Sequence, residues 1–355
     1  MTYRVSIIGA GIGAQHLDGY AQLPDRFSVV SVCDLNEERG RKLADQYPGV
    51  TWTGSLDAVL ADPGVDIVNI CLPPHLHMRT LMAALDAGKI VVCEKPLVDS
   101  LEEADEVAAK VAETNGRLYP VFQYRYGLGT AQLHALIDAG LAGKCFAGSL
   151  ETHWDRDAEY YSVPWRGTWA GEQGGALLGH AIHIHDLLPS LIGPVARVYA
   201  DTATRVNPIE VEDCAALAIR MESGALITSS VTLGCAGNMS RLRLMFEGFT
   251  VESDHAPYAL ATKGWTFTAR APTTQAQIDA VVATATGSKP RYAGMFEAMA
   301  DHLDGKPARI VDYDAARKSI EFVTACYHSA RTGAPVDLPL PPDHPLYAGW
   351  LPEGR

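Results

Sequence analysis

Lys95 lies at the end of an apolar run, Ile90 to Cys93, and between Glu94 and Pro96. The β-branched residues of this run predict a buried strand, where a terminal cation is costly unless it has a use. In an open parallel sheet, ligands bind at the carboxyl edge of the strands, and Pro96 favours extended backbone that directs the lysine. Lys95 is therefore a candidate for stabilising negative charge that develops in a reaction. An ion pair with Glu94, or solvation at the strand end, would also explain it.

A histidine-rich segment is the second candidate for chemistry. His180, His183 and His185 lie within six positions, and Asp186 follows. His-x-His-Asp resembles metal-ligand runs, but such a site needs strand geometry. The surrounding leucines and isoleucines recur at helical spacing, which predicts a helix with His183 and His185 on nearly opposite sides. We therefore expect no metal site here. His180, His183 and Asp186 would then form one stripe, in which Asp186 orients His183 as an acid/base group; alternatively the histidines only cap and pack the helix.

A glycine-rich turn follows the first apolar run, residues 3–8. Its sequence is Gly9-Ala10-Gly11-Ile12-Gly13-Ala14. Gly9 permits a tight turn, Gly11 lets the backbone approach a pyrophosphate, and Ala14 allows a helix to pack closely on the strand. The turn therefore predicts a dinucleotide site.

Asp34 supports this prediction, because it ends the second strand-like run, residues 28–33, and lies 20 residues beyond Ala14. An acid at this distance binds the hydroxyl groups of the adenosine ribose. Asp34 would repel a 2′-phosphate, so NAD is the expected cofactor. NADP is the less favoured alternative, since Arg39 and Arg41 lie near in sequence.

The elements that would position these residues change character near residue 122. Strand-like and helix-like segments alternate before it, which predicts an α/β Rossmann domain over residues 1–122 with a doubly wound parallel sheet. After it, period-2 runs with short turns predict a second domain over residues 123–355, α+β in class, with a large, mostly antiparallel sheet. Helices should cover one face of that sheet. The open face predicts a homodimer or homotetramer. A helix from 315 to 332 and a proline-rich tail should wrap back over the body.

Composition excludes several classes of function. The chain has 355 residues, 47% of them hydrophobic, and a net charge of −13, with no basic run to bind nucleic acid or an anionic membrane. Its seven cysteines contain no Cys-x-x-Cys pair and are expected to be buried thiols. A chain with no leader-like start and no long apolar stretch is expected to be cytoplasmic.

Several of these motifs occur together in a recognisable order. Taken together, they resemble the Gfo/Idh/MocA family, named for glucose-fructose oxidoreductase and inositol dehydrogenase, over essentially the whole chain. The motifs are the Gly-x-Gly turn, Leu72-Pro73-Pro74-His75-Leu76-His77, Glu94-Lys95-Pro96, Gln123-Tyr124-Arg125, Trp165-Arg166, and Gly174-Gly175-Ala176-Leu177 leading to His183-Ile184-His185-Asp186-Leu187.

The resemblance implies an NAD(P)-dependent oxidoreductase of sugars, inositols or related polyols. It makes Lys95 and His183 the catalytic pair. The implied cofactor contacts are Gly9, Gly11, Ile12, Gly13 and Asp34 for the dinucleotide, and Leu72, Pro73, His75, His77, Glu94, Lys95, Gln123, Trp165 and Arg166 toward the nicotinamide.

One position departs from the family pattern. Many of these dehydrogenases carry an aspartate four residues before the histidine, where this chain has Gly179. His180 could compensate as a further catalytic residue. The expected substrate contacts, which suit a sugar unless the aromatic stretch is only a surface loop, are Lys95, Arg125, Trp154, Arg156, Tyr160, His180 and His183.

Three functions remain open at this point. The first is an NAD-dependent sugar or polyol dehydrogenase. The second is a glycoside hydrolase on the same fold, which oxidises the sugar transiently to a 3-keto intermediate and recycles the cofactor. The third is a dinucleotide-binding sensor without activity, although binding alone would not need both Lys95 and His183.

Overall fold

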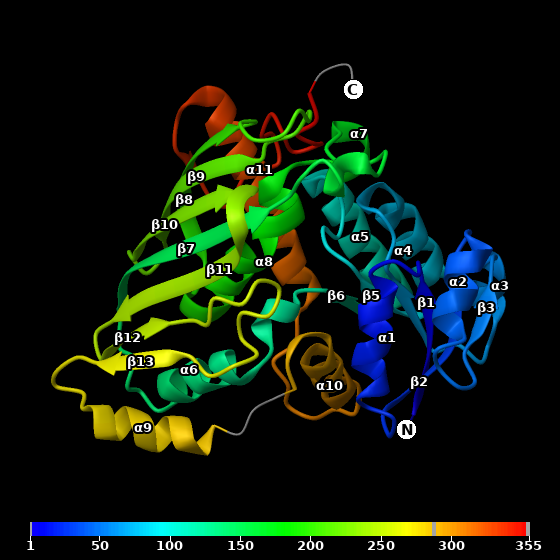
Figure 1. Cartoon of the computed structure of the whole chain (residues 1–355), viewed down its shortest axis with the longest axis horizontal. Coiled ribbons are helices and arrows are strands. Elements are labelled where there is room, and N and C mark those ends of the chain that lie inside the picture. The colour runs from blue at the N-terminus through cyan, green and yellow to red at the C-terminus, as the bar shows by residue number, and fades with distance from the viewer. Residues whose placement is uncertain (1, 286–288, 353–355) are drawn as a thin grey trace. The chain divides into compact units, whose positions relative to one another are not determined.

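The computed structural model describes residues 2–285 and 289–352, and the chain folds into two units (Figure 1). The first unit contains Met1–Val121 and Tyr292–Arg317; the second contains Phe122–Arg291 and Lys318–Arg355. Residues 292–317 therefore pack with the first unit, whereas the sequence analysis placed them in the second domain. Each unit has its own sheet.

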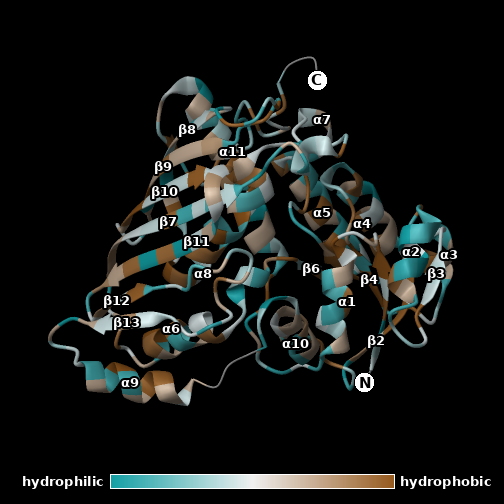
Figure 2. Ribbon diagram, viewed as in Figure 1, coloured by the Kyte–Doolittle hydropathy of each residue, from teal (hydrophilic) through white to brown (hydrophobic). Residues whose placement is uncertain are grey.

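The first unit is a six-stranded parallel sheet in the order β3-β2-β1-β4-β5-β6, which confirms the predicted Rossmann fold. All four residues of β4 are buried, and Figure 2 shows strands of this sheet coloured mostly as hydrophobic. Such continuous burial is typical of a parallel sheet covered on both faces. The strands are β1 (Tyr3–Ile8), β2 (Phe27–Cys33), β3 (Thr51–Thr53), β4 (Ile67–Ile70), β5 (Ile90–Cys93) and β6 (Leu118–Pro120).

Helices connect these strands, and three of them begin at a residue whose side chain caps the helix. Asn36, Ser55 and Ser100 each accept a hydrogen bond from a backbone amide of the helix that follows, which satisfies an otherwise unpaired donor. The helices are α1 (Gly13–Ala21), α2 (Glu37–Ala44), α3 (Leu56–Ala61), α4 (His77–Asp86), which follows the short η1 (Pro74–Leu76), and α5 (Leu101–Thr114).

The strand order reverses between β1 and β4. A crevice outside the carboxyl ends of the strands forms at such a switch point and is where open α/β sheets bind ligands. Gly9 follows β1, Cys71 follows β4 and Glu94 follows β5, so the turns that carry the predicted motifs all leave this edge.

The second unit is built on an eight-stranded mixed sheet in the order β13-β12-β11-β7-β10-β9-β8-β14. Its neighbours pair antiparallel except β10 with β7, which run parallel, and this confirms the predicted class. The strands are β7 (Cys145–Asp155), β8 (Val195–Ala203), β9 (Cys214–Met221), β10 (Leu226–Thr232), β11 (Gly234–Phe246), β12 (Phe249–Glu252), β13 (Thr266–Ala269) and β14 (Val336–Asp337).

One face of this sheet is covered by helices. Alternate residues of β9 and β10 are buried, and the buried face meets α8 through His185 and Ser229, and α11 through Ala200 and Ser329. The other face carries exposed apolar side chains such as Phe146 and Leu226. The remaining elements of the second unit are η2 (Gln123–Arg125), α6 (Leu128–Asp138), η3 (Tyr160–Ser162), α7 (Trp169–Glu172), a π turn η4 (Leu177–Ala181), α8 (Ile182–Ile192), α9 (Gln275–Thr284) and most of α11 (Tyr313–Thr332). The helix α10 (Arg291–Leu303) lies almost wholly in the first unit.

Across residues 2–285 and 289–352, no helix combines the length and the apolar character that crossing a membrane requires. The sequence analysis did not foresee β3, β12, β13, β14, α7, α9 or α10. Most of these elements have four residues or fewer, and such short segments give little local signal.

Candidate active site

The glycine turn after β1 has the geometry that a dinucleotide site requires. Gly9 has φ +101°, and a Cβ on it would lie 2.4 Å from the carbonyl oxygen of Cys71. A Cβ on Gly13 would lie 2.7 Å from a methyl carbon of Ile7, whereas nothing lies within 4 Å of one on Gly11. Gly9 and Gly13 are therefore required by the fold. Gly11 instead leaves room at the surface for a pyrophosphate to approach.

Asp34 is fixed at the end of β2 by hydrogen bonds. Its carboxylate accepts from the amides of Ala10 and Asn36, each at 2.8 Å, and from Nε and Nη2 of Arg39 at 3.0 and 2.7 Å. Burial of Asp34 acts to raise its pKa, but these hydrogen bonds, that of Arg39 first, outweigh it and lower the pKa. The side chain is therefore a charged acceptor suited to ribose hydroxyl groups.

NAD is expected to bind about tenfold or more tightly than NADP, because the charged Asp34 would face the 2′-phosphate. Asp34→Ala should weaken NAD binding and narrow the gap, since it also releases Arg39 from its ion pair. Calorimetric titration of both cofactors measures this. Equal or stronger binding of NADP by the unchanged protein would contradict the prediction.

Glu94 ties the Lys95 segment to the interior of the first unit. Only 5% of Glu94 is exposed, and its carboxylate meets Nε2 of His16 at 2.9 Å, the hydroxyl of Tyr292 at 3.3 Å and the backbone amide of Lys95 at 3.0 Å. Lys95 itself is partly exposed and is joined to Pro96 by a cis peptide bond. These contacts fix the backbone from which the lysine extends.

His77 links the loops that follow β4 and β5. Its ring nitrogens lie 2.6 Å from the carbonyl oxygen of Pro96 and 2.8 Å from that of Leu72, and its side chain is fully buried. Burial lowers the pKa of His77. This geometry holds the Lys95–Pro96 turn in place. Pro73 is partly exposed, and His75 is exposed on η1.

Asp99 lies just after this turn and carries a perturbed carboxyl. Burial, and secondly the charge of Glu103, raise the pKa of Asp99 to about 7. A raised carboxyl pKa means that the folded state binds the proton more tightly than the unfolded state does. The stability that this gives is fully present below the ordinary pKa of about 3.9 and is lost as the pH rises through 7.

Asp99→Asn is therefore expected to flatten the decline of stability between about pH 5 and pH 8 and to stabilise the protein by a few kcal/mol at the upper end. Thermal unfolding at both pH values measures this. Glu102→Gln, which removes an exposed charge from the same segment, is the control and should leave the profile unchanged. An unaltered slope in Asp99→Asn would contradict the assignment.

Glu212 positions the start of the histidine-rich segment in the second unit. Its carboxylate accepts hydrogen bonds from the amides of Gly175 and Leu177 at 3.0 and 2.9 Å and from the hydroxyl of Tyr327 at 3.1 Å. Burial raises its pKa to about 7. A Cβ on Gly175 would lie 1.9 Å from the carbonyl oxygen of Glu212, which explains the glycine at this position.

The sequence analysis expected His180, His183 and His185 to lie on one regular helix. The structure does not confirm this. Residues Leu177–Ala181 form a π turn, and the α-helix starts only at Ile182, so His180 belongs to the π turn. π turns of this kind are frequent at functional sites. Nothing lies within 4 Å of a Cβ placed on Gly179 in this turn, so the departure from the family pattern leaves open space.

The histidines face different partners. The ring of His183 stacks on Tyr124 at 4.9 Å and 19°. His185 points to the sheet, where its Nε2 lies 2.9 Å from the hydroxyl of Ser229, and burial lowers its pKa to about 3. The expected divergence of His183 and His185 is confirmed. In the described part of the chain, no group of three or more His, Cys, Asp or Glu is arranged to hold a metal ion.

Asp186 of α8 forms a buried ion pair with Arg125 of η2. It accepts from Nε and Nη2 of Arg125 at 2.7 and 2.6 Å, with 1% of the Asp186 side chain exposed. This two-bond geometry fixes η2, which also carries Gln123 and Tyr124, against α8. Arg125 therefore has a structural partner as well as its predicted place among the substrate contacts.

An aromatic cluster with two arginines surrounds His180. Trp154 meets its ring edge-on at 5.3 Å, and the hydroxyl of Tyr160 lies 3.2 Å from its Nε2. The guanidinium carbons of Arg156 and Arg166 lie 4.8 and 4.0 Å from the centre of the Tyr160 ring. Trp165 packs against Arg166 at 4.5 Å. The sequence analysis named all of these residues, and the second unit brings them together.

Four further residues contact candidate residues of their own unit and were not named as site residues: two in the first unit and two in the second. His16 and Tyr292 contact Glu94, Tyr124 stacks on His183, and the backbone amide of Tyr258 donates to the Tyr124 hydroxyl at 2.9 Å. A histidine two positions after the Gly9–Ala14 turn was a usable signal for His16. Tyr292 and Tyr258 are distant in sequence from their partners and had none.

Both units of the chain match models of known protein families. Residues 3–122 match a family model described as "Oxidoreductase family, NAD-binding Rossmann fold", and residues 130–252 match the GFO/IDH/MocA C-terminal domain. The chain belongs to the Gfo/Idh/MocA family. NAD is accordingly its cofactor, and the glycine turn and Asp34 fit it.

Individual relatives include proteins that are named as dehydrogenases. D-glucoside 3-dehydrogenase of Escherichia coli is 26% identical over 94% of this chain and 97% of its own length. Uncharacterized oxidoreductase C115.03 of Schizosaccharomyces pombe is 31% identical over 59% of this chain and 58% of its own length. The structure of the WlbA dehydrogenase from Bordetella pertussis with NADH and UDP-GlcNAcA matches with a TM-score of 0.83 and 29% identity, over 96% of this chain and 100% of the other.

Proposed function

We propose that this protein oxidises a secondary hydroxyl group of a sugar, glycoside or polyol and transfers the hydride to NAD. The observation that carries the proposal is the position of Lys95. It follows β5 at the sheet edge from which the dinucleotide turn after β1 also leaves, in a chain that belongs to an NAD-binding oxidoreductase family. A cation at that edge suits a reaction that develops negative charge beside the cofactor.

In this reaction the imidazole of His183 takes the proton of the substrate hydroxyl, and the ammonium of Lys95 stabilises the alkoxide that develops. Only 6% of His183 is exposed, and its stacking on Tyr124 fixes the plane of the ring. Burial raises the pKa of Tyr124 to about 12, so this neighbour stays neutral. NAD supplies the hydride acceptor when bound.

The substrate class follows from relatives and from the aromatic cluster. D-glucoside 3-dehydrogenase is named for a glucoside, and WlbA was solved with a nucleotide sugar. Trp154 is buried, but Tyr160 and Trp165 are partly exposed, and the CH faces of a pyranose stack on such rings. A pyranoside is therefore the favoured substrate over an acyclic polyol.

A screen of sugars and glycosides, followed both by NADH absorbance and by product analysis, tests the function. The proposal expects NADH to form in equal amount with a keto product. Glycoside cleavage without net NADH would instead indicate hydrolysis through a transient 3-keto sugar. Absence of both products across the screen would leave only NAD binding and refute an enzymatic role.

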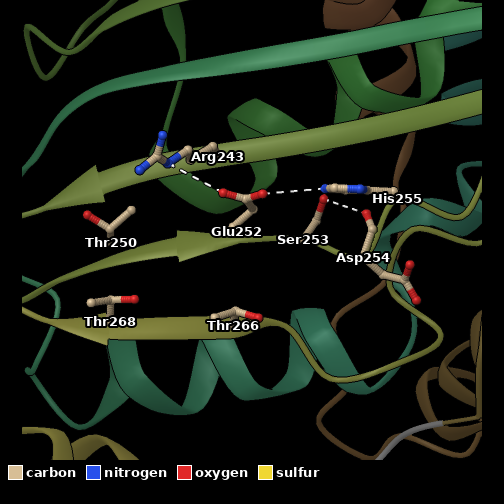
Figure 3. Close-up of a pocket in the computed structure, with 8 residues that line it drawn as sticks. All are labelled: Arg243, Thr250, Glu252, Ser253, Asp254, His255, Thr266 and Thr268. Atoms are coloured by element: carbon tan, nitrogen blue, oxygen red, sulfur yellow. Dashed lines mark hydrogen bonds and ion pairs between the residues drawn. The ribbon is translucent and has the colours of Figure 1, made fainter.

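We also propose a cytoplasmic homo-oligomer that pairs through the open face of the eight-stranded sheet. Support comes from the exposed Phe146, Tyr199 and Leu226 on its strands. A hollow of about 440 Å³ lies on β11, β12 and β13, where Arg243 and His255 both approach the Glu252 carboxylate (Figure 3). Leu226→Glu should shift the mass measured by light scattering toward the monomer. An unchanged mass in that variant would contradict this interface.

A further inference from the structure

Arg156 is a buried cation whose partners are all neutral. Only 9% of the residue is exposed. Its Nη1 donates to the backbone oxygen of Asp155 at 2.6 Å and to Oδ1 of Asn238 at 3.3 Å, and its Nη2 donates to the hydroxyl of Tyr258. Within the described part of the chain it forms no ion pair. A buried charge without a counter-ion is costly, and proteins that retain one usually use it.

The hydrogen bonds of Arg156 show which edge of its guanidinium could bind an acceptor of a ligand. Its Nε makes no hydrogen bond to any described residue. Nε and Nη2 form the side edge of the guanidinium, and this is the edge by which Arg39, Arg125 and Arg197 each bind a carboxylate with two hydrogen bonds. On the same edge of Arg156, Nε is buried without a hydrogen bond and Nη2 donates to a tyrosine hydroxyl. Planar guanidinium and carboxylate groups match in this geometry.

Tyr258 covers this edge, so a ligand that binds there would have to displace it. It is 39% exposed and has φ +62°, a conformation that a bulky residue rarely adopts. Its backbone amide is held by the hydroxyl of Tyr124, whose ring stacks on His183. An incoming carboxylate would replace the neutral Tyr258 hydroxyl with a charged acceptor, next to the residues that contact His183.

The surroundings of Arg156 favour an anionic group held against rings. Its guanidinium lies over Trp154 at 5.0 Å and Tyr160 at 4.8 Å, and Arg166 covers the Tyr160 ring at 4.0 Å. The nearest acidic neighbours in sequence, Asp155 and Asp157, are exposed. Arg166 pairs with Glu172 at 3.5 Å. Within the described part of the chain, Arg156 is therefore the arginine of this cluster that has no ion pair, and it would attract an anion.

We propose that Arg156 binds a carboxylate substituent of the substrate through its Nε–Nη2 edge, which makes the substrate an acidic sugar of the uronic acid class. The inference rests on the proposed function for its sugar ring and adds the charged group. Arg156 is then the residue that separates acidic sugars from their neutral counterparts. A charge-assisted pair of hydrogen bonds supports a preference of about 10- to 100-fold.

The test uses the NADH-loaded protein, in which no turnover occurs, and measures binding by calorimetry. The probes are D-glucuronate against D-glucose and D-galacturonate against D-galactose, with D-glucose 6-phosphate as a second anion. Wild type should bind at least one uronate about 10- to 100-fold more tightly than its neutral partner. Arg156→Met should abolish the preference, and Arg156→Lys, which keeps the charge without the two-bond edge, should retain a smaller part of it.

A structural role for Arg156 predicts a different pattern. It would lower the melting temperature of Arg156→Met but leave the ratio of uronate to neutral sugar unchanged, and this outcome would overturn the proposal. Lack of preference in both wild-type pairs would also overturn it. Stronger binding of the 6-phosphate would keep Arg156 as the anion-binding residue and overturn the carboxylate. Binding without NADH production from NAD in any pair would preserve Arg156 and refute only the dehydrogenase function.

Discussion

Alanine in place of Lys95 or His183 is expected to lower kcat by about 100-fold or more while NAD affinity changes little. Positioned acid/base groups contribute about 10²- to 10⁴-fold in rate, and stabilisation of a developing alkoxide has a similar effect. Both residues act on one transition state, so the double variant should lose much less than the product of the single losses. Steady-state kinetics and NAD titration of the three variants measure this. A multiplicative double variant would show that the two residues act in separate steps.

The pH profile identifies which histidine carries the proton. Oxidation by the wild-type protein should rise through an apparent pKa in the histidine range. That limb should vanish in His183→Ala and persist in His180→Ala. The reverse result would assign the proton to His180, which lies in the π turn beside Gly179 and contacts Tyr160. His185→Gln is the control, because His185 faces Ser229 on the sheet side of α8.

The second large effect separates two glycines of one turn. Gly9→Ala is expected to destabilise the protein by several kcal/mol, since its Cβ would lie 2.4 Å from a backbone oxygen at φ +101°. Gly11→Ala should leave the stability of the cofactor-free protein within about 0.5 kcal/mol, because nothing lies within 4 Å of the added carbon. It should nevertheless weaken NAD binding by about tenfold or more, since the carbon occupies the space of the pyrophosphate.

Denaturant unfolding and NAD titration of both variants are the measurements. Gly49→Ala is a useful control, because Gly49 also has a positive φ of +83° with nothing within 4 Å of its Cβ. It should show only the backbone strain and no loss of NAD affinity. If Gly11→Ala bound NAD as tightly as the wild type, the pyrophosphate would not approach this turn.

The sequence was sufficient for the parts of the molecule in which local pattern and final structure agree. The first unit alternates buried strands with capped helices, and its turn glycines have meanings that depend only on neighbouring residues. Asp34 could be placed from its distance to Ala14 alone, and the structure puts the amide of Ala10 on its carboxylate. In such segments, the residues that determine the local fold are also the residues that would bind the cofactor.

The remainder depends on contacts that no local pattern contains. Glu212 accepts a hydrogen bond from the amide of Leu177, at the start of the π turn Leu177–Ala181. Because Glu212 is distant in sequence, the helical periodicity of residues 177–191 could not reveal this contact. Tyr258 reaches Arg156 from a loop more than 100 positions away, and exposed polar loops give little indication of where they fold. For the same reason, the sequence could name Arg156 as a sugar contact but could not show that its side edge lacks a counter-ion.

The return of Tyr292–Arg317 to the first unit has a consequence for the order in which the protein can fold during synthesis. In α10, Phe296 stacks on Tyr20 at 3.8 Å, and Tyr292 donates a hydrogen bond to Glu94. The first sheet is synthesised before the second, but it cannot complete its packing until α10 has been synthesised, after the main strands of the second sheet. A fragment ending at Val121 would lack this helix and expose the apolar surface it covers. The nucleotide-binding half is therefore not a separable module, despite its early position in the chain.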